Sequence, residues 1–205
     1  MLKNAGIKAT SADITVADLV AEEIHLISTS GNITASTVTP ALEVVTTSGD
    51  QNVRQDSVID SAALGSTSGN IACTLDVAKN VKIESTSGGI GLTVTDAADT
   101  VQMGSTSGNV YPELASVNRA EFSSTSGSIT AGIGAFGEMK VNSTSGTVTL
   151  TLPETPGFRC SVNTVSGSFE SAIALSKNGN VYSCGDSDAV CSIGTTSGDI
   201  RILAK

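Results

Sequence analysis

Apolar and polar residues alternate with a period of two along most of the chain, and the alternation restarts at a recurring polar phrase. The phrase is most often Ser-Thr-Ser-Gly, and its glycine provides a register for the whole sequence. Residues seven and five positions before the glycine are apolar in nearly every copy, whereas the residue between them is mainly polar. This alternation is typical of a β-strand with one buried face. The pattern therefore predicts a strand that leads into each phrase.

The same alternation resumes after the glycine, which predicts a second strand in each unit. The column seven residues before the glycine contains Ile24, Leu42, Ala62, Val81, Val101, Ala120, Met139, Cys160 and Cys191. The column five residues before it contains Leu26, Val44, Leu64, Ile83, Met103, Phe122, Val141, Val162 and Ile193. The column two residues after it contains Ile33, Ile71, Ile90, Val110, Ile129, Val148, Phe169 and Ile200. The column four residues after it contains Ala35, Val53, Cys73, Leu92, Ala131, Leu150 and Ile202. We expect all four columns to face the core.

The units recur with a nearly constant period. The glycines of the phrase are Gly31, Gly49, Gly69, Gly88, Gly108, Gly127, Gly146, Gly167 and Gly198. Their separations are 18, 20, 19, 20, 19, 19, 21 and 31 residues. A degenerate copy upstream has Ala12 in the glycine position. The chain therefore contains about ten units between about residues 7 and 202, and the long last interval predicts an insertion at about residues 172–192.

Two repeat architectures are compatible with units of this length. A propeller blade of four strands would use two units, so alternate units would occupy different environments and differ in character. Every unit here reads alike, which favours a solenoid in which each unit is one coil and equivalent residues stack about 4.8 Å apart. The predicted fold is all-β: a single-domain parallel β-solenoid over residues 1–205, with about ten coils of 18–21 residues, two short strands per coil and a longer C-terminal insertion.

The polar phrase is expected to build one corner of each coil. Glycine suits a tight corner because it accepts positive φ without a clash at Cβ. If the alternation of inward and outward side chains continues through the phrase, its first and second hydroxyl residues face the interior. There they are expected to bond to one another or to the turn backbone. A column of small apolar residues eleven positions before the glycine is expected to line the opposite corner. That column contains Val20, Val38, Val58, Val77, Ala97 and Ala135.

The central Thr of the phrase is expected to point outward as a column. Flat Thr arrays on β-solenoids can bind ice, but such a site needs two parallel Thr ranks. The position two residues earlier carries unlike residues, among them Gly65, Glu84 and Asn142. We therefore interpret the column as β-branched residues that favour strand structure.

Composition narrows the possible function classes. Aromatic residues make up 3% of the chain and tryptophan is absent, so the core must be thin and aliphatic. The net charge of −9 argues against nucleic acid as a partner, because binding to phosphates depends on Lys and Arg. No apolar run approaches 18 residues and the first residues contain no signal peptide, so we expect no direct membrane insertion by this chain.

No residue pattern identifies a catalytic centre. His25 is the only histidine, and its column places it on an outer strand face without the partners of a triad or a metal site. Acidic residues occur at three turns, and no basic partner stands out beside them. The residues are Asp18, Glu22 and Glu23 at the first turn, Asp56 and Asp60 at the second, and Asp96 and Asp99 at the third. We therefore predict no catalytic residue, no cofactor-binding residue and no cofactor, and a protein that is not an enzyme.

No metal site is predicted either. Several corner glycines are followed by Asn or Asp, but one such ligand per coil is too few for Ca²⁺, and turn chemistry is the better interpretation. These residues are Asn32, Asp50, Asn70, Asn109 and Asp199. The four cysteines form no CxxC motif, which argues against zinc and thioredoxin-like chemistry.

The sequence allows two alternative disulfides. Cys160 and Cys191 share a column in consecutive repeats, where neighbouring strands bring Cα atoms within bonding reach. Cys184 and Cys191 instead flank Gly185-Asp186-Ser187-Asp188, which is typical of a hairpin turn. Buried free thiols are an equally open alternative.

The repeat phrases resemble those of the bacterial DUF4097 family of adhesin-like β-strand-repeat proteins. The matching residues are the recurring units S/T-x-S-G-[DNS]-[IV], together with T-L-P-E-T-P-G-F at Thr151–Phe158, T-V-S-G at Thr164–Gly167 and T-T-S-G-D-I-R-I at Thr195–Ile202. The resemblance spans essentially the whole chain. It implies an exported or envelope-associated β-solenoid, often carried behind a membrane anchor. The cysteines and the missing anchor depart from the family pattern, and we expect the natural protein to extend upstream of Met1.

The preferred functional hypothesis is a non-enzymatic, adhesin-like scaffold, at the cell envelope or outside the cell, that presents flat β-faces to a protein or glycan partner. A carbohydrate-active enzyme is the first alternative, because elongated β-helix proteins often cleave polysaccharides with paired carboxylates about 5–10 Å apart. A polymer that self-associates through the ends of the solenoid is the second alternative.

Overall fold

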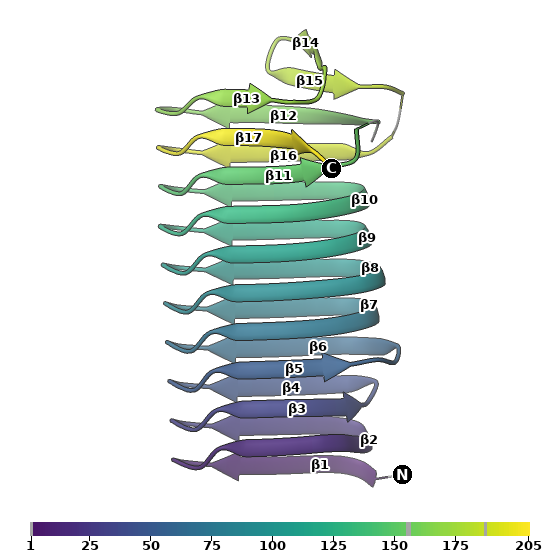
Figure 1. Ribbon diagram of the computed structural model, residues 1–205, viewed down its shortest axis with the longest axis vertical. Helices are drawn as coiled ribbons and strands as arrows, with labels where there is room; N and C mark the ends of the chain where they lie inside the picture. Colours follow the sequence, from purple (N-terminus) through teal and green to yellow (C-terminus); the bar gives the residue numbers. More distant parts are fainter. Residues whose placement is uncertain (1, 155–156, 187) are drawn as a thin grey trace.

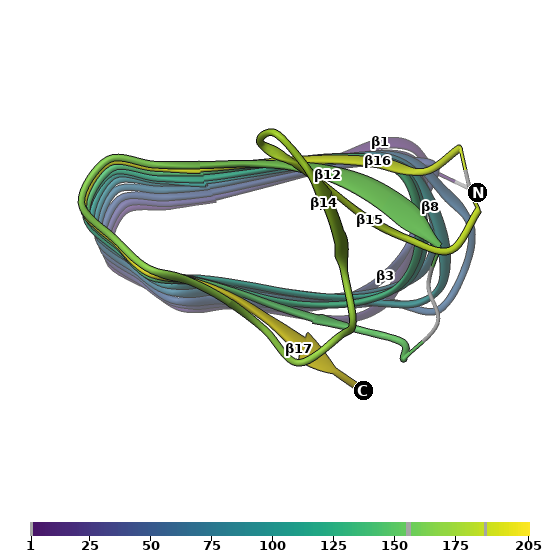
Figure 2. The same cartoon turned by 90° about the horizontal axis from the view of Figure 1, so that it is seen from above.

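The chain winds into a rod of stacked β-coils in the computed structural model, which describes residues 2–154, 157–186 and 188–205 (Figure 1). These residues form seventeen strands and no helix. Two long sides, here called face A and face B, meet at the sharp corner that the glycine phrase makes. In the end-on view the chain runs counter-clockwise as it rises toward the viewer, so the solenoid is right-handed (Figure 2). The predicted all-β parallel solenoid is confirmed.

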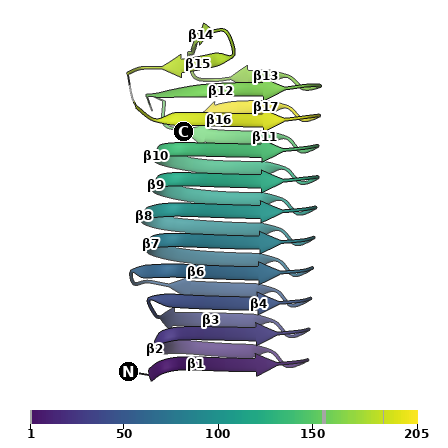
Figure 3. The same cartoon turned by 180° about the vertical axis from the view of Figure 1, so that it is seen from behind.

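Face A holds the strand segments that run toward the glycine corner, and face B holds those that run away from it (Figures 1 and 3). Face A contains β1 (Leu2–Ala9), β4 (Ala41–Thr46), β6 (Ile59–Ser66), β12 (Phe158–Thr164), β16 (Val190–Thr195) and the second halves of β2 (Ile14–Ser28), β7 (Ile71–Ser85), β8 (Ile90–Ser105), β9 (Val110–Ser124) and β10 (Ile129–Ser143). Face B contains the first halves of these five long strands, with β3 (Ile33–Val38), β5 (Gln51–Gln55), β11 (Val148–Leu152), β13 (Phe169–Ser171) and β17 (Ile200–Ala204). The long strands continue from face B to face A around the opposite, rounded end.

Neighbouring coils pair in parallel and in register, so equivalent side chains stack in columns. Ile24 of β2, for example, pairs with Leu42 of β4, which pairs with Ala62 of β6. The residues of all four predicted core columns are buried, apart from the half-buried Phe169. The core between the two faces is accordingly thin and mostly aliphatic.

The last two coils do not follow chain order, which corrects the expectation of about ten consecutive coils. β16 lies between β10 and β12, since Cys191 pairs with Met139 on one side and with Cys160 on the other. β17 likewise lies between β11 and β13. Figure 1 shows this reversal, with the yellow C-terminal coil beneath the green coil that precedes it in sequence. About eight coils thus succeed one another regularly, and the final coil is sandwiched below the one before it.

The predicted insertion contains the hairpin of β14 (Ser176–Asn178) and β15 (Val181–Cys184), whose turn has Gly179 at a φ of 61°. β15 pairs antiparallel with the outer edge of β12 and covers part of it, as exposed sheet edges require. The insertion ends earlier than the expected residue 192, because β16 begins at Val190. The insertion is long because the chain must return from the outermost coil to the level between β10 and β12, where β16 lies.

The corner glycines do not adopt positive φ, contrary to the expectation from the sequence. Among the described glycines, positive φ occurs at Gly157, Gly179 and Gly185. The corners need glycine for a different reason: a Cβ at Gly108 would lie 1.9 Å from the carbonyl oxygen of Gly88 in the coil below. Ala12 is accommodated at the first corner because no described coil lies beneath its methyl group.

The first hydroxyl of each phrase faces inward as predicted, and it stabilises the corner. Ser105 Oγ accepts a hydrogen bond from the Gly108 N–H at 2.9 Å and donates to the Gly88 carbonyl at 3.4 Å. The second serine is exposed in every coil, so the inward prediction was wrong for that column. The exposed residues are Ser30, Ser48, Ser68, Ser87, Ser107, Ser126, Ser145, Ser166 and Ser197. At this residue the backbone has already turned, as the Ser107 N–H donates to the Thr86 carbonyl in the coil below at 2.9 Å.

The column expected to line the rounded end is displaced by one position. Val20, Val38 and Val58 are 44%, 42% and 57% exposed, so they face solvent rather than the core. The inward residues are the next ones along the chain, such as Ala21 and Ile59, which are fully buried. Register shifts in the long strands at this end explain the change of parity.

Candidate functional site

Of the acidic residues noted in the sequence, Glu23 contacts His25, whereas Asp18 and Asp60 bond to other neighbours. At the rounded end Asp18 accepts a hydrogen bond from Ser36 at 3.0 Å, and Asp60 forms an ion pair with Lys79 at 2.7 Å. These groups are exposed. They do not converge on a common point, so they offer no paired acid and base.

The Asn and Asp residues after the corner glycines form a ladder between coils. Asn32 Oδ1 accepts a hydrogen bond from the Asp50 N–H at 2.9 Å, and Asp50 Oδ1 accepts one from the Asn70 N–H at 2.7 Å. Each side chain thus satisfies the backbone of the next coil rather than its own turn. These hydrogen bonds explain why Asn or Asp follows the corner glycines, so a bound cation is not needed to explain them.

A shallow groove crosses face A, where strands β4 and β6 carry small outward side chains. Its two contiguous halves share Glu43 and Ala63, and we call the whole depression the face A groove. It is lined by Glu23, His25, Ala41, Leu42, Glu43, Val45, Ser61, Ala63, Leu64, Gly65, Lys82 and Glu84. The floor is Ala and Gly, and charged side chains form both rims. The Lys82–Glu84 ion pair, at 3.1 Å, makes the rim on β7.

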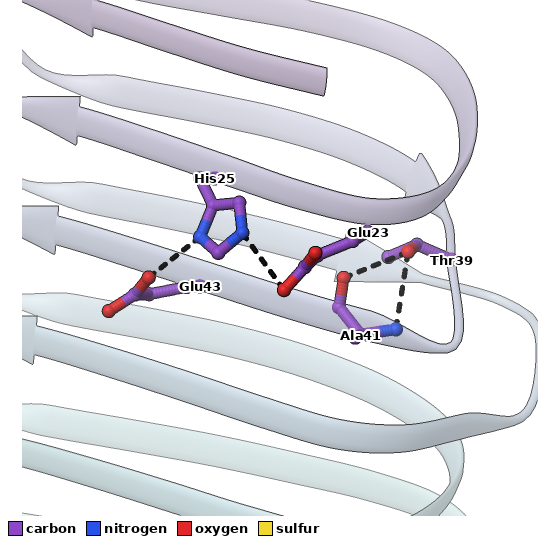
Figure 4. Close-up of polar contacts among 5 residues, drawn as sticks. All are labelled: Glu23, His25, Thr39, Ala41 and Glu43. Carbon is purple, nitrogen blue, oxygen red and sulfur yellow. Dashed lines mark hydrogen bonds and ion pairs between the residues drawn. The ribbon is translucent and has the colours of Figure 1, made fainter. Parts of the chain in front are cut away.

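The opposite rim is built around His25, whose ring lies between two carboxylates (Figure 4). Glu43 occupies the equivalent position in the next coil, and its Oε2 lies 2.7 Å from His25 Nδ1. Glu23 is two residues earlier on the same face, and its Oε1 lies 3.0 Å from His25 Nε2. A local turn sets the start of β4, because Thr39 Oγ1 donates to the Ala41 carbonyl at 2.8 Å and accepts from the Ala41 N–H at 3.2 Å. The site therefore depends on the register between β2 and β4.

The electrostatics of this rim favour a protonated imidazole. The hydrogen bond with Glu43 is the largest effect and raises the pKa of His25 above its usual 6.5; burial, the next largest, opposes it, and the bond and charge of Glu23 raise the pKa further. An imidazolium donates one N–H to each carboxylate. Both ring nitrogens are then occupied, so the histidine has no free lone pair with which to activate a serine or a water. The arrangement is suited to binding and charge presentation rather than to proton transfer.

A titration of His25 tests this geometry directly, because the chain has no other histidine. We expect the imidazole resonances in NMR spectra to report a pKa above 6.5. The linked stability follows the sign of the shift: it is fully present below pH 6.5 and is lost as pH rises through the folded-state pKa. Replacing Glu43→Gln should lower the pKa more than replacing Glu23→Gln, since Glu43 makes the stronger contact.

Lys79→Gln is the matched control for that titration. It removes the charge that pairs with Asp60 between β7 and β6, and it leaves the contacts of His25 with Glu23 and Glu43 intact. A His25 pKa at or below 6.5, or equal effects of both glutamine variants and the control, would contradict the bridging arrangement.

The described part of the chain contains no group of three or more His, Cys, Asp or Glu side chains arranged to hold a metal ion. The carboxylates beside His25 lie against opposite nitrogens, so one ion could not contact all three side chains without rearrangement. No helix within residues 2–154, 157–186 and 188–205 is long and apolar enough to cross a membrane.

Comparison with known proteins bears on the whole solenoid rather than on the groove. The sequence model of a family described as Toastrack DUF4097 matches residues 1–94 and again residues 77–203. Neither a curated protein nor a solved structure matches the chain. The two family matches together span nearly all of the repeats, and the resemblance noted in the repeat phrases is confirmed. The chain belongs to the Toastrack DUF4097 family.

Proposed function

We propose that this protein is a non-enzymatic interaction scaffold at the cell envelope, and that face A is the surface that binds its partner. The observation that carries the proposal is the face A groove, a depression with a small-residue floor and charged rims. Both the floor and the rims are fixed by in-register coils. A rigid surface of this kind binds without the entropic cost of ordering a loop.

The chemistry of the groove favours a protein partner over a glycan. The aliphatic floor offers apolar contact and the rims offer paired charges, a combination typical of protein interfaces. The exposed aromatic ring of Tyr111 lies on face B, away from the groove, and its hydroxyl accepts a hydrogen bond from Asn109 at 2.8 Å. The envelope location is supported by the resemblance to exported and envelope-associated repeat proteins, and cell fractionation would test it.

Blocking the groove should abolish partner binding. Ala63→Arg places a long charged side chain on the floor, and we expect capture of the partner from envelope extracts to fall at least about tenfold, as for the loss of a central interface contact. Quantitative mass spectrometry of material retained on the immobilised protein measures the effect. Ala72→Arg is the matched control, because Ala72 is exposed on face B in the neighbouring coil.

The pattern of losses separates the possible outcomes. Loss with Ala63→Arg alone, together with sensitivity of the retained partner to protease, supports the proposal. Equal binding by the two variants would exclude the groove, and retention that is destroyed by glycan oxidation but not by protease would identify a glycan partner instead.

One observation favours a second function, the hydrolysis of a glycan. Glu23 and Glu43 are two carboxylates beside a groove, which is the arrangement that glycoside hydrolases use. Against it, the imidazole of His25 lies between them and occupies the space that a sugar would need. Release of reducing ends from envelope polysaccharides by the wild-type protein, but not by Glu43→Gln, would establish the enzymatic alternative.

A further inference from the structure

Two cysteine side chains meet in the core between the last two coils. Cys160 of β12 and Cys191 of β16 are direct partners in parallel register, and both are buried. Such neighbours lie about 4.8 Å apart, within the Cα separation of about 4.4–6.8 Å that a disulfide spans. The neighbouring Cys160 thiol and burial both raise the pKa of Cys191.

The remaining cysteines lie out of reach of this pair. Cys184 of β15 is opposite Phe158 on the outer edge of β12, so the whole of β12 separates it from Cys191. Two strand spacings amount to about 9.6 Å, which exceeds the disulfide range. Cys160 itself faces Tyr182 across that edge rather than Cys184. Cys73 is buried in β7, where burial raises its pKa to about 12. All four cysteines are free thiols in this structure, and of the two bonds that the sequence leaves open, their placement fits Cys160–Cys191.

The pair lies at the point where chain order is reversed. The two cysteines are 31 positions apart, and the segment between them holds β13 and the β14–β15 hairpin. This segment carries the chain around the outer coil and back to the inner level. The inner position of β16 otherwise depends on strand pairing and packing. A covalent link would close the segment into a loop and join the outer coil to the coil beneath it.

We propose that Cys160 and Cys191 form a disulfide that fixes the reversed order of the last two coils. The bond forms by exchange with a disulfide oxidant, either a small molecule or a protein. The two thiols lose two protons and two electrons as one S–S bond forms, and the S–S bond of the oxidant is reduced to two thiols. Because both side chains are buried in the finished fold, the exchange occurs while β16 docks against β12. Afterwards the bond is shielded from thiol reductants.

The test is oxidative refolding of the full chain with oxidised glutathione, followed by peptide mapping without reduction. Trypsin separates Cys160 from the other two cysteines of this region, and cleavage at Asp186 or Asp188 then separates Cys184 from Cys191. We expect a cross-link between the Cys160 and Cys191 peptides in the wild type and in Cys184→Ser. Oxidised wild-type protein should melt on the order of 5–10 °C above reduced wild-type protein, a comparison that needs no substitution.

Two further measurements complete the test. Cys191→Ala should abolish the melting difference, whereas Cys184→Ser should retain it. Oxidised glutathione added to folded, reduced protein should form the bond at least about tenfold more slowly than during refolding, because the thiols are buried. A cross-link to Cys184, a cross-link between two chains, or free thiols at all positions after oxidative refolding would overturn the proposal. Equal melting temperatures of the oxidised and reduced protein would show that the disulfide does not fix the order of the last two coils.

Discussion

Replacing Gly108→Ala should destabilise the protein by about 3 kcal/mol or more, because overpacking against rigid backbone belongs to the most damaging class of substitution. The new Cβ would lie 1.9 Å from the Gly88 carbonyl oxygen and 2.9 Å from Ser105 Oγ. Neither atom can move freely, since Ser105 bonds to the Gly108 N–H and the corner backbone bonds to the coils above and below. The measurement is the midpoint of urea denaturation followed by circular dichroism.

Gly65→Ala is the matched control, because a Cβ at Gly65 would meet no atom within 4 Å. That variant should be neutral or more stable by up to about 1 kcal/mol, as alanine restricts the unfolded chain. Ala12→Gly should change stability by less than about 0.5 kcal/mol, because its methyl group is exposed. If Gly108→Ala behaved like Gly65→Ala, close stacking could not be the reason for the corner glycines.

The stacked columns could be predicted because the same constraint is imposed on every coil. An inward position such as that of Ile24, Leu42 and Val81 is filled nine times by apolar residues, which makes the alternation visible without coordinates. The reason for the corner glycines was not visible in the same way, because positive φ and close backbone approach both select glycine. Ala12 was the available signal, because a methyl group replaces the glycine at the one corner that has no described coil below it.

The order of the last two coils could not be predicted from the pattern. β12 and β16 present the same inward alternation, through Cys160 and Val162 in one and Cys191 and Ile193 in the other. Either strand fits either level, so the columns carry no information on which lies inside. The 31-residue interval showed that something interrupts the repeat, but not that the chain passes around its own end.

The groove was only partly accessible to sequence reasoning. The alternation placed His25 on an outer face, where the structure has it. Its partners follow from two simple relations that were not combined: Glu23 shares the face two residues earlier, and Glu43 is the same column in the next unit. The depression itself depends on three small outward residues, Ala41, Ala63 and Gly65, and small residues give no charge or motif signal.

Replacing Phe122→Ala should lower the free energy of unfolding by about 3–5 kcal/mol, the usual cost of removing a buried aromatic ring. Phe122 is fully buried in β9 and pairs with Met103 below and Val141 above. Coil spacing is held by the strand hydrogen bonds at about 4.8 Å, so the neighbouring coils cannot close on the cavity. The expected result is a lower urea midpoint with an unchanged slope.

Tyr111→Ala provides the comparison within the same strand, because that ring is 46% exposed and its loss removes little packing. It should cost no more than about 1 kcal/mol, mainly through the hydrogen bond with Asn109. Phe122→Leu should recover most of the loss, since it keeps apolar volume in the column. Equal costs for Phe122→Ala and Tyr111→Ala would mean that the thin interior does not hold the coils together, and stability would then have to reside in the hydrogen-bonded ladders alone.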